Sequence, residues 1–174
     1  MNSFIALPGA SRDGGSIALI AAAGGEAQNG ANRVETPPAC AAGIVAIAPH
    51  DCVEDICLAG IARARAAYER GDLRERLAKY HRDVDSAFHG GCDAWLAPQR
   101  RGWNIASLLP DIACPMLAIQ GRQDEYATLE QIEAIGRRAP RAERLILEPC
   151  GHFPHLTHAD AVIDGIAAFI GDRN

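Results

Sequence analysis

Short apolar runs alternate with helix-like patterns along this chain. Four short runs have the length and composition of strands, at residues 4–7, 44–48, 115–121 and 144–147, and the run 44–48 is apolar throughout. Segments with helix-forming composition or helical periodicity occupy residues 16–23, 129–138 and 159–170. Strands that alternate with helices predict an α/β fold, in which a mostly parallel sheet is covered by helices on both faces.

Two segments interrupt this alternation. Residues 24–43 are rich in Gly, Pro and Asn and predict a long loop. Residues 53–80 have a charged helical pattern with a break at Gly71–Asp72. We therefore expect a helical insert between the second and third strands.

The end of the insert has no clear helical or strand pattern. Residues 81–110 contain the pair Gly90–Gly91 and Pro98, and they predict irregular or short-helical structure. Trp95 and Trp103 are expected to be packing anchors rather than residues that stack on a substrate.

The composition narrows the class of protein. A chain of 174 residues, 48% of them hydrophobic, can form one domain with a sizeable core. Its net charge of −5 argues against a nucleic-acid or membrane partner, and no apolar run could span a bilayer. The first residues lack the basic segment of a secretory signal, and the six cysteines form no C-x-x-C motif. We therefore expect a cytoplasmic protein with reduced thiols.

Three polar residues follow predicted strands at the point where each strand ends. Ser11 follows the first strand, Asp124 the third and His152 the fourth. The carboxyl ends of parallel strands meet at one edge of a sheet, where such folds place their chemistry. A serine hydroxyl becomes a good nucleophile when an imidazole takes its proton, and a carboxylate orients that imidazole. The chain order Ser, Asp, His is that of the α/β-hydrolase triad.

With these residues in view, the chain resembles an α/β-hydrolase-fold enzyme with a helical cap. Asp124 in AIQGRQDEYATLEQI matches the acid position of that family, and His152 in ILEPCGHFPHL matches its histidine position. The stretches IVAIAPHDCVED and RGWNIASLLPDIACPMLAIQG are similar to the chain entering and leaving the cap. The resemblance implies a hydrolase core at residues 1–50 and 111–174 and a helical cap at residues 51–110.

The resemblance also implies an activity. Ser11 would be the nucleophile, His152 the general base and acid, and Asp124 the carboxylate that orients His152. The reaction would be hydrolysis of an ester, or another acyl-type bond, in a small-molecule substrate. No cofactor and no metal ion are expected.

Other interpretations of these residues stay open. Asp124 could be a charge near a helix N-terminus, and His152 could be a surface-loop histidine. His152, His155 and His158 form an H-x-x-H-x-x-H pattern that could suit a metal ion. The spacing is loose, Pro154 breaks any helix there, and no acidic cluster flanks the histidines, so a metal site is the least favoured interpretation.

The turn around Ser11 departs from the family pattern. That pattern resembles G-H-S-D-G-G-S, whereas this chain has GASRDGGS at residues 9–16. Counted from the strand, Ser11 takes the nucleophile position; counted back from the helix, that position falls on Arg12. If Ser11 acts, the backbone N–H of Arg12 is the expected oxyanion donor. Ser16 is a more distant candidate because it belongs to the predicted helix.

A second departure concerns what precedes the first strand. Members of the family have further strands and helices before the nucleophile strand, so the chain resembles an N-terminally truncated, partial α/β-hydrolase fold. The missing segment would include the loop that supplies one of the two oxyanion donors in this family. Loss of one such donor lowers the rate by a factor of about 10²–10³. The first strand would also become an open edge that favours self-association. The alternative to an active hydrolase is therefore a catalytically impaired or inactive fragment, without the N-terminal strands and the oxyanion loop.

Overall fold

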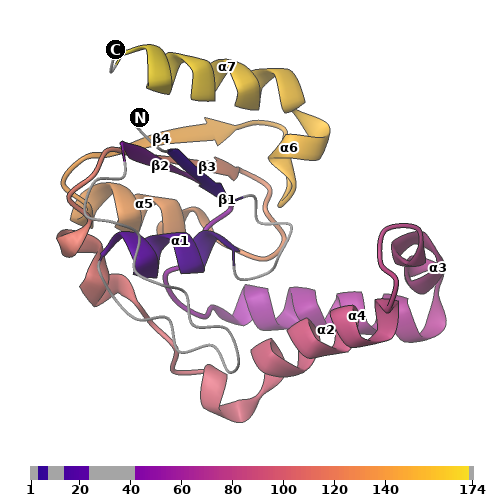
Figure 1. Cartoon of the computed structure of the whole chain (residues 1–174). Coiled ribbons are helices and arrows are strands. Elements are labelled where there is room, and N and C mark those ends of the chain that lie inside the picture. The colour runs from indigo at the N-terminus through magenta and orange to yellow at the C-terminus, as the bar shows by residue number, and fades with distance from the viewer. Residues whose placement is uncertain (1–3, 8–13, 24–41, 173–174) are drawn as a thin grey trace.

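A four-stranded parallel sheet forms the centre of the fold (Figure 1). The structure is a computed structural model that describes residues 4–7, 14–23 and 42–172. In chain order, which is also their order in the sheet, the strands are β1 (Phe4–Leu7), β2 (Gly43–Ile47), β3 (Met116–Gly121) and β4 (Ala142–Leu147). They lie at the four apolar runs, so the predicted α/β class and parallel sheet are confirmed.

Helices cover both faces of this sheet. Helices α1 (Gly14–Ala22) and α5 (Leu129–Arg138) lie on one face, and α7 (Ala159–Gly171) lies on the other (Figure 1). Alternate strand residues point to the two faces, so β2, which is buried along its whole length, is apolar at every position, whereas β4 has the exposed Glu143 and Arg144. Those packed with α1 and α5 are Ile44, Met116 and Ala118, and those packed with α7 are Val45, Ile47, Leu117 and Ile119.

The insert between β2 and β3 is helical, as expected. It contains α2 (Asp55–Arg70), α3 (Leu73–Ala78), α4 (Val84–Leu96) and two short 3₁₀ helices, η1 (Pro98–Arg100) and η2 (Ala106–Asp111). Helix α2 ends at the predicted break, where Gly71 donates its backbone N–H to the carbonyl of Ala67. Helices α2 and α4 bury an apolar cluster of their own, which is separate from the two clusters on the sheet.

The prediction for residues 81–110 is wrong in one respect, because α4 is a regular helix of 13 residues. Its glycine pair is offset by side-chain packing: Val84, Phe88, Cys92 and Trp95 are buried at helical spacing along one face. Asp83 caps the helix, since its side chain accepts a hydrogen bond from the backbone N–H of Ser86 at 3.0 Å. The apolar residues at helical spacing and the N-cap Asp83 are both present in the sequence, but Gly90 and Gly91 favoured a prediction of irregular structure.

Several predictions fall on residues outside the described part of the chain. These include Ser11, Arg12 and most of the loop predicted at 24–43, although Gly43 at its end is the first residue of β2. Among the described residues, β1 is an edge strand whose strand partner is β2. The described helices include none with both the length and the hydropathy needed to cross a membrane.

Candidate active site

The candidate site lies where β2, β3 and β4 end. Because the strands are parallel and in register, their carboxyl ends bring three loops together at one edge of the sheet. The first loop contains His50 and Asp51, the second contains Asp124, and the third contains His152. The second and third loops carry the acid and the histidine predicted from the sequence.

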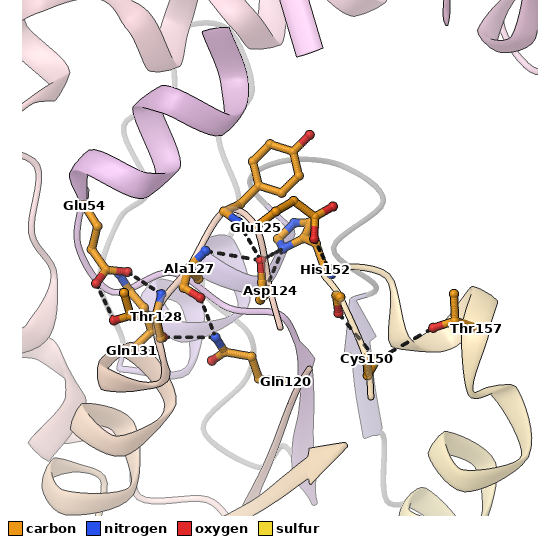
Figure 2. Close-up of polar contacts among 12 residues, drawn as sticks. Glu54, Gln120, Asp124, Glu125, Ala127, Thr128, Gln131, Cys150, His152 and Thr157 are labelled. Carbon is orange, nitrogen blue, oxygen red and sulfur yellow. Dashed lines mark hydrogen bonds and ion pairs between the residues drawn. The ribbon is translucent and has the colours of Figure 1, made fainter. Parts of the chain in front are cut away.

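Asp124 and His152 meet across the ends of β3 and β4. The Nδ1 atom of His152 lies 2.9 Å from Oδ2 and 3.0 Å from Oδ1 of Asp124 (Figure 2). The Asp124 side chain is fully buried, and that of His152 is 10% exposed. With Nδ1–H donated to the carboxylate, a neutral His152 has its Nε2 available as a proton acceptor.

The loop after β3 fixes the Asp124 carboxylate. Its Oδ1 accepts the backbone N–H groups of Tyr126 at 2.8 Å and Ala127 at 3.2 Å (Figure 2). From below, the buried Gln120 amide donates to the carbonyls of Ala127 and Thr128, at 3.2 and 3.0 Å. A carboxylate held by backbone donors has a defined orientation, as a residue that orients an imidazole requires.

Asp124 is not the cap of the helix that follows it. Helix α5 starts at Leu129, and Thr128 is its N-cap, accepting the N–H of Glu130 at 3.2 Å. Asp124 therefore does not act as a charge at the terminus of α5, because its side chain contacts His152 and the backbone of its own loop. His152 is likewise more than a surface-loop residue, because its ring contacts a buried carboxylate.

The site contains a second histidine, His50, which was not predicted from the sequence. His50 follows β2, is 5% exposed, and its ring centroid lies 5.8 Å from that of His152 and 5.3 Å from that of Trp95. Within the part of the chain that the structure describes, its buried Nδ1 has no hydrogen-bond partner. Burial, and secondarily the charge of His152, lowers the pKa of His50 from 6.5 to about 4. The signal was available, since His50 also stands at the carboxyl end of a parallel strand.

Asp51, next to His50, is a further buried titratable group. It is 3% exposed, and burial raises the pKa of its carboxyl group. Its backbone N–H donates at 2.8 Å to Oε1 of the buried Gln131 on α5. The same Gln131 donates to the carbonyl of Cys52 and to the Glu54 carboxylate, so it connects the start of the insert to helix α5. Figure 2 shows Gln131 beside Glu54.

The structure distinguishes the roles of the remaining candidates. Ser16 is buried on α1 and donates its hydroxyl to the His50 carbonyl at 2.8 Å, which joins α1 to the end of β2. Trp95 is 1% exposed within the apolar cluster of the insert, and Trp103 packs edge-on against it. Both tryptophans are therefore packing residues, as expected. Ser11 and Arg12 are outside the described residues.

The three histidines of the H-x-x-H-x-x-H pattern do not converge. Among the described residues there is no group of three His, Cys, Asp or Glu side chains that could hold a metal ion. His152 contacts Asp124, whereas His158 lies 2.9 Å from the hydroxyl of Thr157. Pro154 begins the short helix α6 (Pro154–Thr157), a position where proline is tolerated, rather than preventing a helix.

Comparison with known proteins agrees with the fold. The sequence profile of the alpha/beta hydrolase family matches residues 9–164, so the chain belongs to this family. Curated relatives include the pimeloyl-[acyl-carrier protein] methyl ester esterase of Xanthomonas campestris, 30% identical over 115 residues that cover 66% of this chain and 44% of the relative. The esterase of the same name from Vibrio atlanticus is 34% identical over 66 residues, which cover 38% of this chain and 26% of the relative. The chain thus spans less than half the length of these relatives.

Solved structures show the same fold at low sequence identity. The meta-cleavage product hydrolase from Pseudomonas fluorescens aligns with a TM-score of 0.69 at 17% identity, covering 99% of this chain and 66% of that one. The enol-lactonase from Burkholderia xenovorans aligns with a TM-score of 0.60 at 18% identity, covering 98% and 66%.

Proposed function

We propose that this chain carries the site of a serine esterase in which Ser11, His152 and Asp124 form the catalytic triad. The observation that carries the proposal is the contact between the Asp124 carboxylate and Nδ1 of His152 at the carboxyl end of a parallel sheet. Membership of the alpha/beta hydrolase family and the esterase names of the curated relatives support the same reaction class.

The proposed mechanism follows from what each group can do. His152 Nε2 removes the proton of Ser11 Oγ as that oxygen attacks the ester carbonyl, and Asp124 stabilises the imidazolium that forms. The backbone N–H of Arg12 donates to the developing oxyanion. His152 then protonates the departing alkoxide. In the second half, His152 activates a water molecule that hydrolyses the acyl-enzyme and frees Ser11.

The proposed substrate is a carboxylic ester with a small alcohol group. The curated relatives are named for hydrolysis of a methyl ester on an acyl carrier protein, which makes methyl esters of acyl chains the first compounds to test. The helical insert, residues 51–110, is proposed to cap the site, because Trp95 of α4 contacts His50 beside His152.

A fluorophosphonate probe tests the proposal directly, because it reacts with an activated serine before any substrate is known. We expect labelling of the purified, folded chain at Ser11, located by peptide mapping, and loss of labelling in Ser11→Ala and His152→Ala. Ser16→Ala is the matched control and should remain labelled. Folded protein that takes up no probe would instead support the alternative, an inactive member of the family. Labelling at Ser16 would reassign the nucleophile.

A further inference from the structure

The two residues that flank Asp124 both reach the loop that carries His152. The Gln123 side chain accepts the backbone N–H of Cys150 through Oε1 at 2.8 Å. The Glu125 side chain accepts the backbone N–H of His152 through Oε2 at 3.1 Å (Figure 2). Asp124 itself holds the His152 ring, so three consecutive residues contact the segment Cys150–His152.

The Gln123 contact has a well-defined orientation. Its backbone N–H donates to the Cys150 carbonyl at 2.8 Å, so the two residues exchange hydrogen bonds in both directions. The Nε2 atom of Gln123 lies 3.4 Å from Oε1 of Glu148, which fits the amide with its oxygen toward Cys150. Cys150 is also held from the other side, where its Sγ lies 3.7 Å from the Thr157 hydroxyl.

Glycines allow the two loops to lie so close. A Cβ atom on Gly151 would lie 2.9 Å from Oε2 of Glu125, and one on Gly121 would lie 2.2 Å from the Gly151 carbonyl. The Glu125 carboxylate therefore rests over the backbone of Gly151. The other side of Glu125 is held as well, because its carbonyl accepts a hydrogen bond from Arg63 of α2 at 3.4 Å.

From these contacts we infer that Gln123 and Glu125 are positioning residues, which hold the His152 loop so that its imidazole stays seated on Asp124. This deepens the proposed function, on which its catalytic consequence rests. Neither side chain is required to touch the substrate. Each fixes one backbone N–H, on either side of Gly151, and a loop held at both points keeps the His152 ring in one orientation.

Two alanine variants and two conservative variants test the inference. Gln123→Ala and Glu125→Ala remove the acceptors, whereas Gln123→Glu and Glu125→Gln keep an oxygen that can accept the same backbone N–H. Glu75→Ala, which removes an exposed carboxylate on α3, is the matched control. The readouts are the ring nitrogen signals of His152 by ¹⁵N NMR, the rate of fluorophosphonate labelling, and the urea midpoint.

We expect a single Nδ1–H form of His152 in the wild type, the two conservative variants and the control. In each alanine variant the ring signals should shift or broaden, and labelling should slow about tenfold, because each variant loses one hydrogen bond to the backbone of the His152 loop. The urea midpoint should change little, which separates positioning from general stability. Unchanged His152 signals in both alanine variants overturn the inference. Failure of the wild type to react with the probe would count against the proposed function, while the NMR measurement still decides this inference.

Discussion

Replacing the buried His50 by phenylalanine should make the protein less sensitive to acid. Burial lowers the pKa of His50 from 6.5 to about 4, so the folded state resists protonation that the unfolded state accepts. The contribution of neutral His50 to the free energy of unfolding is therefore fully present above pH 6.5. It is lost as the pH falls from 6.5 to about 4. A tenfold change in proton affinity corresponds to about 1.4 kcal/mol, so the whole loss is about 3 kcal/mol.

The measurement is urea unfolding of the wild type and of His50→Phe at pH 7 and pH 5. By pH 5 the wild type should have lost about 2 kcal/mol through His50, and the variant should lack that part of the pH dependence. Groups near His50 that also carry charge, namely His152, Asp124 and Glu54, are common to both proteins and cancel in the comparison. His81→Gln, which removes an exposed histidine, is the matched control. An equal loss of stability in wild type and His50→Phe would refute the reasoning.

Three other predictions follow from the sheet and its loops. Asp124→Asn should leave the fold intact but slow fluorophosphonate labelling by about 10³–10⁴, because an amide cannot hold and stabilise the same imidazole; labelling at the wild-type rate would contradict the triad. Gly121→Ala should destabilise the protein by about 1–3 kcal/mol in urea unfolding, since its Cβ would lie 2.2 Å from the Gly151 carbonyl, and an unchanged midpoint would show that the loop can move aside. Because β1 is an edge strand among the described residues, size-exclusion chromatography should reveal self-association that increases with concentration; a monomer at every concentration would contradict this.

Most of the fold could be predicted because the sheet is buried on both faces. The central strands β2 and β3 are buried along their whole length and are mostly apolar, so the runs 44–48 and 115–121 stand out from the helical segments. Helix α4 was missed because composition was weighed above periodicity: Gly90 and Gly91 suggested irregular structure, while buried packing of Phe88 and Trp95 compensates for them.

The candidate site was predictable only in part. Asp124 and His152 could be found because strand ends in a parallel sheet converge, and their distance of 2.9 Å agrees with that expectation. His50 stands at an equivalent position, but its burial beside His152 follows from the packing of the insert and is not visible in the sequence around it. The contacts of Gln123 and Glu125 depend on how closely two loops approach, which no local pattern in the sequence encodes.

The separate apolar cluster of the insert bears on how this protein could change over evolutionary time. The buried residues of α2 and α4 pack mainly on one another, and the cluster contacts partly buried side chains such as Trp103 and Tyr126. Tyr126 lies two residues after Asp124, and its ring packs 4.8 Å from that of His152. The buried side chains of the insert can therefore change over evolutionary time while the sheet keeps Asp124 and His152 paired, as long as Tyr126 retains its contacts.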